Sequence, residues 1–349
     1  MKILNIGVIG CGMAWNRLHL PAVNRLSDKF KVVALSDTHE ESLKYSAKKS
    51  NLGESDLYLD YKEMLKRDDI DVVVVAVPIH LNYEVARDVA KTKKNMICEK
   101  PLGENMEECI NFLKLEKEFK VKILVAENFR HDEENNIIKN ILAKGSLGTP
   151  VYFVRNYITN FSEQMKKDTF AAKEWRQHPK FKCGVFLDNC VHELAAIRYI
   201  FGGVERVSAF GSGTDKEYTP YTCVTSLLKF HSGVSGYFSF WSESEEKQTP
   251  PLGFRIFCTQ GSIYLSDKLS GCIEVFYNDG KTEKISFTPK EGYYNEFLNF
   301  YDALTMNIEI ETTPIIEFGD TKLVFDIIDS IEKESIINVL DSTKEILQS

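Results

Sequence analysis

Short runs of apolar and β-branched residues alternate with amphipathic stretches in the first third of the chain. We predict strands at residues 3–9, 31–35, 71–77, 95–98 and 122–126, with helices between them. The run from Asp71 to Val77 is apolar at every position after the aspartate, which is typical of a strand covered on both faces in a parallel sheet. Short connections between such strands require right-handed crossovers, so this region is predicted to be an α/β domain with a doubly wound parallel sheet.

After about residue 130 the pattern changes, because strand-like runs follow one another with few helical segments between them. The predicted strands are residues 151–157, 204–210, 223–230, 234–240, 254–258, 262–266 and 273–277. Turn sequences such as His231–Gly233 and Asn278–Gly280 join several of them into hairpins. Consecutive hairpins make a large, mostly antiparallel open sheet.

The predicted helices of this second region are residues 184–201, 293–306 and 320–337. We therefore divide the chain into an N-terminal domain at residues 1–128 and a C-terminal α+β domain at residues 129–349. Helices on one side of an open sheet leave its other face to be covered. We expect association into a homodimer or homotetramer through that face.

Composition and charge narrow the function. The chain has 349 residues and a formal net charge of −8, without a block of lysine and arginine that would favour nucleic acid or an anionic membrane surface. A small-molecule substrate is therefore expected. The eight cysteines form no C-x-x-C pair and no metal-ligand spacing with histidine, which predicts reduced thiols, no metal site and a cytoplasmic protein.

The apolar run at the N-terminus could be mistaken for a targeting signal. It is short and is interrupted by Asn5 and Gly7, so we interpret it as the first strand. Elsewhere the sequence lacks the roughly 20 consecutive apolar residues that a membrane-spanning helix needs.

The first strand leads into a glycine-rich turn with the sequence Gly10-Cys11-Gly12-Met13-Ala14-Trp15. Such a turn between a strand and a helix is typical of dinucleotide binding in a Rossmann fold. Gly10 permits the tight turn, and Gly12 lets the backbone approach a pyrophosphate at the helix N-terminus, where Met13 and Ala14 follow. An ordinary glycine turn is the alternative interpretation.

Asp37 follows the second predicted strand, 25 residues after Gly12. A carboxylate at this place accepts hydrogen bonds from the adenosine ribose hydroxyls and repels a 2′-phosphate, which favours NAD over NADP. The alternative is a cap for the helix that is predicted to start near Glu40.

Further motifs extend this pattern along the chain. They are His19-Leu20-Pro21, Val77-Pro78, Glu99-Lys100-Pro101, Glu127-Asn128-Phe129-Arg130, and a segment that begins at Gly184 and contains Asp188 and His192. With these motifs the chain resembles the Gfo/Idh/MocA family of oxidoreductases over essentially its whole length. The resemblance implies that the lysine reaches the substrate hydroxyl beside the nicotinamide, with the aspartate and histidine supplied by the second domain. It also implies that Val77, Pro78, Glu99, Lys100 and Asn128 contact the cofactor.

Asp188 and His192 lie four residues apart on a predicted helix, so they share one face. Oxidation of a secondary alcohol requires removal of the hydroxyl proton while hydride leaves the same carbon, and a neutral imidazole is a suitable base near pH 7. We predict His192 as the base, Lys100 as the donor that stabilises developing alkoxide charge, and Asp188 as the residue that orients them. Taken singly, each has a structural interpretation as a solvated lysine, a residue at a helix start or a half-buried histidine.

Four residues are predicted on the substrate side, because aromatic faces stack on sugar C–H surfaces and guanidinium groups bind hydroxyls: Arg130, Tyr157, Trp175 and Arg176. A structural role for Trp175 as an anchor of its loop is the alternative. The chain also departs from the family pattern at five positions, which are Trp15, Ile79, Asn82, Cys183 and Cys190.

The sequence thus predicts an NAD-dependent dehydrogenase that acts on a secondary hydroxyl of a sugar, sugar derivative or cyclitol. Two alternatives stay open. One is an enzyme that keeps NAD tightly bound for redox exchange between sugars or for an elimination. The other is a nucleotide-binding sugar sensor or repressor without turnover.

Overall fold

A computed structural model describes residues 2–339 of the chain, and they form two compact units. Within this range the first unit comprises residues 2–128 and 293–318, and the second comprises residues 129–292 and 319–339. The sequence-based division assigned everything after residue 128 to the second domain. In the structure the chain returns to the first unit at Tyr293 and leaves it again after Phe318.

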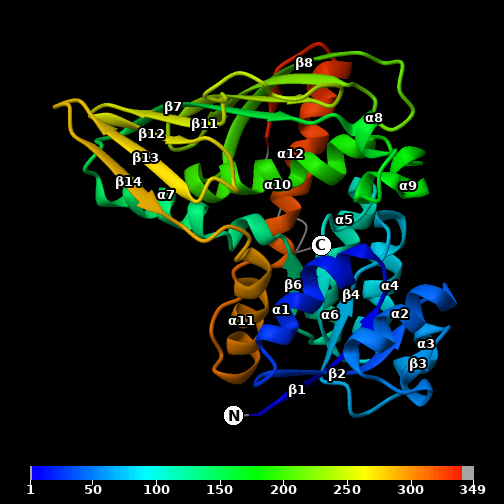
Figure 1. Cartoon of the computed structure of the whole chain (residues 1–349). Coiled ribbons are helices and arrows are strands. Elements are labelled where there is room, and N and C mark those ends of the chain that lie inside the picture. The colour runs from blue at the N-terminus through cyan, green and yellow to red at the C-terminus, as the bar shows by residue number, and fades with distance from the viewer. Residues whose placement is uncertain (1, 340–349) are drawn as a thin grey trace. The chain divides into compact units, whose positions relative to one another are not determined.

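A parallel sheet forms the centre of the first unit, as the sequence predicted (Figure 1). Its six strands within residues 2–339 have the order β3-β2-β1-β4-β5-β6, and all their pairings are parallel. The strands are β1 (Leu4–Ile9), β2 (Phe30–Ser36), β3 (Leu57–Tyr58), β4 (Val72–Val75), β5 (Asn95–Glu99) and β6 (Ile123–Ala126). The order reverses between β1 and β4, which is where doubly wound sheets bind ligands.

Helices surround this sheet, and one of them comes from the returning segment. The helical elements are η1 (Trp15–His19), α1 (Leu20–Arg25), α2 (Glu40–Ser50), η2 (Glu54–Asp56), α3 (Tyr61–Met64), α4 (Ile79–Lys91), α5 (Met106–Phe112), α6 (Leu115–Phe119), η3 (Asn128–Arg130) and α11 (Gly292–Thr305). η3 crosses from the first unit into the second after Asn128. The edge of β6 is covered because the backbone N–H of Val125 donates to the carbonyl of Thr312 at 2.8 Å.

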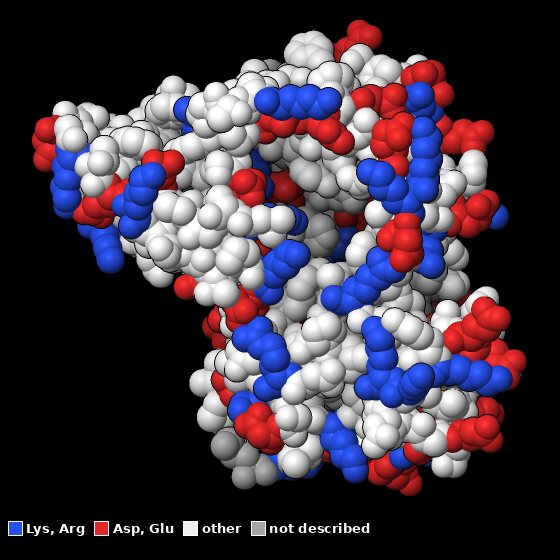
Figure 2. Space-filling model, in the orientation of Figure 1, with Lys and Arg blue, Asp and Glu red and all other residues white. Residues whose placement is uncertain are grey.

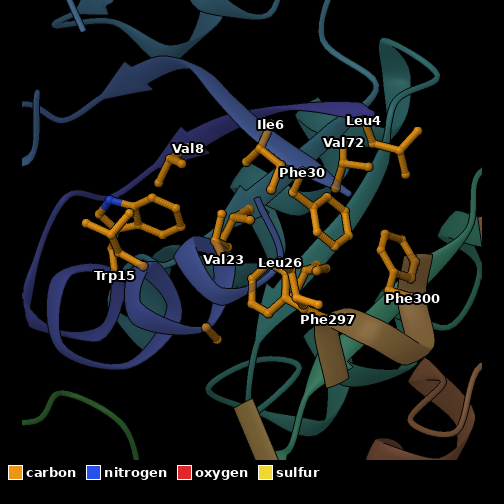
Figure 3. Close-up of a cluster of buried hydrophobic side chains, with 14 of the residues drawn as sticks. Leu4, Ile6, Val8, Trp15, Val23, Leu26, Phe30, Val72, Phe297 and Phe300 are labelled. Atoms are coloured by element: carbon orange, nitrogen blue, oxygen red, sulfur yellow. The ribbon is translucent and has the colours of Figure 1, made fainter. Parts of the chain in front are cut away.

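The core of the first unit explains why residues 293–318 belong to it. Phe297 and Phe300 of α11 are fully buried in one cluster with residues of β1, α1 and β2, as Figure 3 shows. Phe30 meets Phe297 edge to face with 5.7 Å between the ring centroids. Burying two phenylalanines contributes several kcal/mol at about 1.5–3 kcal/mol for each side chain. Helix α11 is therefore an integral part of the first unit.

The second unit is built on a mostly antiparallel sheet (Figure 1). In the described part of the chain its nine strands have the order β14-β13-β12-β11-β7-β10-β9-β8-β15, and only β7 and β10 pair in parallel. The strands are β7 (Pro150–Ile158), β8 (Val204–Ser212), β9 (Cys223–Phe230), β10 (Ser235–Trp241), β11 (Phe254–Cys258), β12 (Gly261–Leu265), β13 (Cys272–Tyr277), β14 (Thr282–Ser286) and β15 (Ile337–Asn338).

One face of this sheet is covered and the other is exposed. The remaining helical elements are α7 (Glu133–Lys144), α8 (Phe161–Gln164), η4 (Phe170–Ala172), α9 (Glu174–Gln177), α10 (Gly184–Phe201) and α12 (Pro314–Glu332), the last of which has residues in both units. Phe201 of α10 stacks on Phe153 of β7 at 4.9 Å, and Phe186 meets Phe240 of β10 at 5.5 Å. On the opposite face large apolar side chains are exposed, among them Tyr152, Leu227 and Ile336.

Basic and acidic side chains are interspersed over the visible surface, without a block of one sign (Figure 2). Among residues 2–339, no helix combines the length and apolar character that a membrane crossing requires.

Candidate active site

The turn after β1 has the two features that a dinucleotide pyrophosphate needs. Gly10 has φ of +95°, and a Cβ there would lie 2.2 Å from the carbonyl oxygen of Ala76, so only glycine fits. A Cβ on Gly12 would meet no atom within 4 Å, which leaves open space above this backbone. Gly10 therefore closes the turn against the neighbouring strand, while Gly12 leaves room for a ligand to approach the main chain. The residues present fit the cofactor that the sequence predicted.

Trp15 occupies the position where a small residue normally follows these glycines. Its side chain is fully buried in the core of the first unit and points towards Val8 (Figure 3). The chain accommodates this bulk by opening with a wide π-helical turn, η1, before α1 begins. The bulky Trp15 side chain thus packs in the core of the first unit. Gly10 and Gly12 still have the conformation and open space that a pyrophosphate site needs.

Asn16, which the sequence did not indicate as a site residue, holds the glycine turn by hydrogen bonds to its backbone. Its side-chain amide donates to the carbonyls of Cys11 at 2.8 Å and Gly12 at 2.9 Å, and to Ser46 Oγ at 2.8 Å. Nothing in the sequence pattern distinguishes this buried asparagine from a surface asparagine on an amphipathic helix.

Asp37 lies directly after β2 and braces the glycine turn. Its Oδ2 accepts a hydrogen bond from the backbone N–H of Cys11 at 2.7 Å, and its Oδ1 accepts one from His39 N–H at 2.8 Å. The residue that caps α2 is His39. A carboxylate offers about four acceptor positions, so these two bonds leave capacity for ribose hydroxyls.

Lys100 follows the carboxyl end of β5, at the same edge of the parallel sheet as the glycine turn. Val77, Pro78, Glu99 and Asn128 follow or end neighbouring strands at this edge. All the cofactor-contacting positions predicted from the resemblance are therefore brought together by the first unit. Their contacts with NAD remain predictions.

Asn82 holds the backbone on both sides of Lys100. This fully buried residue of α4 donates from Nδ2 to the carbonyl of Glu99 at 2.5 Å and to that of Pro101 at 2.7 Å. Ile79, another departure from the family pattern, is buried at the start of the same helix. The asparagine thus serves a structural purpose that its sequence position did not reveal.

His19 forms a buried ion pair with Glu99 and also faces a second acid, Glu296. Nε2 of His19 is 2.7 Å from Glu99 Oε1, and Nδ1 is 3.5 Å from Glu296 Oε1 of α11. Hydrogen bonds and charge attraction from the two carboxylates overcome the opposing effect of burial and raise the pKa of His19 to about 9. Burial raises the pKa of Glu296 to about 7, although the neighbouring His19 lowers it. In the sequence His19 stands out only as part of a motif, and no pattern points to Glu296.

In the second unit, Asp188 and His192 lie one turn apart on α10, as predicted. The Asp188 carboxylate is buried and is held by Arg176, whose Nε lies 2.5 Å from Oδ2 and whose Nη2 lies 3.3 Å from Oδ1. His192 is half-buried, and its ring stacks on Phe129 with a centroid separation of 4.8 Å. A carboxylate that receives two guanidinium bonds remains ionised, which suits the predicted orienting role of Asp188.

The four predicted substrate residues have different environments. The Arg176 guanidinium lies 4.1 Å from the Trp175 ring centroid as well as binding Asp188. Arg130 is buried and donates to both oxygens of Asp320, at 2.8 Å and 2.7 Å. Both arginines therefore have clear structural partners that the sequence did not predict, and their contact with substrate remains a prediction.

Tyr157 of β7 stacks loosely on Phe240, with 5.9 Å between the ring centroids. Burial and the nearby charge of Glu193 raise the pKa of its phenol above the ordinary value. A phenol in this state keeps its proton and can donate a hydrogen bond at neutral pH. Its contact with substrate also stays a prediction.

Cysteines at positions 183 and 190 fit the structure of α10, where Cys183 precedes the first helical residue and Cys190 lies in the middle of the helix. Cys183 has φ of −93°, an ordinary value for a residue with a side chain, and both thiols are buried. The glycine that this segment requires is Gly184, which has φ of +50° and where a Cβ would lie 2.4 Å from the Tyr218 carbonyl oxygen. No group of three potential metal ligands is found in the described part of the chain.

Comparison with known proteins agrees with these findings. Residues 4–127 match the profile described as "Oxidoreductase family, NAD-binding Rossmann fold", and residues 136–264 match the "GFO/IDH/MocA C-terminal domain". The chain is 27% identical to the uncharacterized protein YMR315W of Saccharomyces cerevisiae, over 87% of this chain and 88% of that protein. It is 29% identical to myo-inositol 2-dehydrogenase of Thermotoga maritima, over 92% of each chain.

Among solved structures, an oxidoreductase of Thermotoga maritima has the same fold. It superposes with a TM-score of 0.86 over 99% of this chain and 100% of that chain, at 23% identity. The two profiles together cover well over half of the 349 residues. The chain belongs to the Gfo/Idh/MocA family and is an NAD-binding oxidoreductase.

Proposed function

We propose that this enzyme transfers hydride between NAD and a secondary hydroxyl or ketone of a sugar, sugar derivative or cyclitol. The observation that carries the proposal is that Lys100 follows β5 at the same carboxyl edge of the parallel sheet as the glycine turn that follows β1. An amine at this edge is suited to a substrate oxygen next to a bound nicotinamide. The name of the Thermotoga maritima relative, myo-inositol 2-dehydrogenase, supports a polyol as the substrate class.

The chemistry divides between the cofactor and four side chains. NAD accepts the hydride when it is bound. Lys100 donates a hydrogen bond to the substrate oxygen and stabilises the alkoxide charge that develops there. His192, whose ring is fixed by stacking on Phe129, accepts the hydroxyl proton. Asp188 stays ionised because Arg176 forms an ion pair with its carboxylate, and it stabilises positive charge on its neighbours.

The test is a screen for NADH formation over inositols, aldoses, glycosides and sugar acids, followed by two substitutions. Lys100→Met and His192→Ala should each lower kcat by about 100-fold or more, because general acid–base and electrostatic groups contribute on this scale. Binding of NADH, followed by its fluorescence, should be retained. Lys166→Met and His231→Ala, which remove an exposed lysine and an exposed histidine, are the matched controls.

Normal turnover in both site variants would refute the proposal. Substrate conversion without accumulation of free NADH would instead favour an enzyme with tightly held NAD. NAD binding without turnover on any compound would favour a sugar sensor.

We also propose that a second copy of the chain covers the exposed face of the nine-stranded sheet. A groove of about 540 Å³ lies on this face, and Tyr152, Leu227 and Ile336 are among its lining residues. Contiguous exposed apolar surface of this kind marks association sites. Light scattering at micromolar concentration should give the mass of two or four chains, and Leu227→Glu should lower it. A mass equal to one chain for the unmodified protein would contradict the proposal.

A further inference from the structure

His19 is a fully buried histidine that contacts Glu99, the residue before Lys100. It ends the π-helical turn η1, and none of its side chain is exposed. Carboxylates face both of its ring nitrogens, with Glu99 at 2.7 Å from Nε2 and Glu296 at 3.5 Å from Nδ1. The rings of Tyr293 and Phe297 enclose it with centroid distances of 5.5 Å and 5.7 Å.

This arrangement favours a charged ring. A neutral imidazole has a single N–H, so it donates to one carboxylate and turns a lone pair towards the other. The imidazolium carries an N–H on both nitrogens: Nε2–H donates to Glu99, while Nδ1–H faces Glu296 at 3.5 Å, a charge contact longer than a hydrogen bond. The charged ring thus compensates negative charge that would otherwise be buried alone. Glu99 lies at the end of β5 and Glu296 lies on α11, and Glu127, after β6, adds negative charge near Glu296. Glu296 and Glu99 raise the pKa of His19 to about 9 against the opposing effect of burial.

The ion pair acts on the residue next to Lys100. Glu99 is the last residue of β5, and its side chain is anchored by His19 while its carbonyl is anchored by Asn82. Asn82 also holds the carbonyl of Pro101. Both neighbours of Lys100 in the chain are therefore fixed by buried side chains. A long, flexible lysine side chain acts efficiently only when its backbone is fixed in this way.

We infer that His19 is a positioning residue for the reaction: held by Glu296, its ring anchors Glu99 and thereby fixes the strand end that presents Lys100. The inference rests on the proposed function of Lys100. It assigns His19 no contact with substrate or cofactor. It also links α11, which the chain forms only after the second unit, to the site at the edge of the parallel sheet.

The charge of His19 can be tested without measuring activity. Protein labelled with ¹⁵N-histidine is compared by NMR with His19→Gln, which identifies the signal of His19 by its disappearance. His231→Gln, at an exposed position, is the matched control. We expect His19 to show two protonated nitrogens at pH 8, where ordinary histidines are neutral. A neutral ring at pH 7.5 would overturn the inference.

Kinetics test the positioning role. His19→Gln should lower kcat by roughly 10- to 100-fold, the scale of a small misplacement of a reacting group, with the KM for NAD little changed. In the unmodified enzyme kcat should fall as pH rises through the pKa of His19, about 9. Glu296→Gln removes one of the carboxylates that raise this pKa, so the fall should move to lower pH. A residue that only stabilised the fold would not move this midpoint.

The outcomes separate this inference from the proposed function. If Lys100→Met is inactive but His19→Gln turns over like His231→Gln, the proposed function stands and the positioning role is refuted. If Lys100→Met retains normal turnover, the proposed function fails, while the NMR experiment still decides the charge of His19. Should His19→Gln fail to fold, an unmoved midpoint in Glu296→Gln would by itself overturn the inference.

Discussion

The two units differ in the cations that accompany their buried acids. In the first unit Glu99 and Glu296 face a histidine, which can lose its charge within the physiological range or just above it. In the second unit three buried acids face arginines, in the pairs Asp188 with Arg176, Glu193 with Arg155, and Asp320 with Arg130. Arginine does not lose its proton in proteins. The charge of the histidine that binds Glu99 therefore responds to pH, while the charges of these three arginine pairs are fixed.

This difference fits the two predicted roles. A base such as His192 must change its protonation during the reaction, and the permanent ion pair of Asp188 with Arg176, one turn away on α10, keeps a nearby charge constant. The lysine has to remain in place with its charge, and the His19 pair supports it only while that histidine is protonated. Alkaline pH is therefore expected to affect the nucleotide-binding unit before the sheet unit.

Breaking an arginine pair in the second unit should give the largest loss of stability. Arg130→Met removes a buried guanidinium from Asp320, whose carboxylate is completely buried. Removal of one partner of a buried pair costs about 3–5 kcal/mol, and we expect the lower end because Arg198 also binds Asp320. Urea unfolding of this variant, compared with Lys166→Met, measures the loss. An unchanged unfolding midpoint would show that the pair is not a stabilising element.

The fold of both units could be predicted largely from the sequence. The consecutive valines of β4 predicted a strand buried on both faces, and the hairpin turns predicted the antiparallel sheet. Helix α11 was also predicted, but its place in the first unit was not. Its apolar stripe indicates that one face is buried, and the pattern contains no information about which domain buries it.

The site could be predicted only in part, for a related reason. Lys100, Asp188 and His192 were found because they stand in motifs or at helical spacing. Glu296 and the pairing of Arg176 with Asp188 were not, because these contacts depend on the packing of distant or irregular segments. Long-range ion pairs of this kind leave no periodic signal along the chain. They became visible only when the burial of both partners was known.

The pH dependence of stability should separate the histidine pair of the first unit from the arginine pairs of the second. A histidine whose pKa is raised in the folded protein contributes stability that is complete below its unfolded value, near 6.5, and is lost as pH rises through about 9. Between pH 7.5 and 9 the unmodified protein should therefore lose about 1.5 kcal/mol that His19→Gln does not lose, since one pKa unit corresponds to about 1.4 kcal/mol and the ring is still half protonated at pH 9. Chemical unfolding at a series of pH values measures this difference, and parallel curves for the two proteins would contradict it.

A milder change tests whether the geometry of the arginine pairs matters as well as their charge. Arg176→Lys keeps a cation beside Asp188 but removes the planar fork that binds both oxygens. We expect kcat to fall by about tenfold, equivalent to about 1.4 kcal/mol, with NADH binding unchanged. Arg87→Lys in α4, where the guanidinium is partly exposed, is the matched control. Full activity in Arg176→Lys would mean that a point charge suffices to hold Asp188.

The smallest change in stability is expected for exposed ion pairs, which both units contain. Each carries an exposed pair at i and i+3, Glu63 with Lys66 at 2.6 Å and Glu163 with Lys166 at 2.5 Å. Both pairs are largely solvated, so screening and side-chain entropy cancel most of their attraction. Lys66→Met and Lys166→Met should therefore leave Tm unchanged, and pH between 7.5 and 9 should not distinguish them. If Tm depended on pH differently in these two variants, the difference in pH response would be a property of each unit as a whole. Equal curves of Tm against pH would instead confine that difference to the buried acids and their partners.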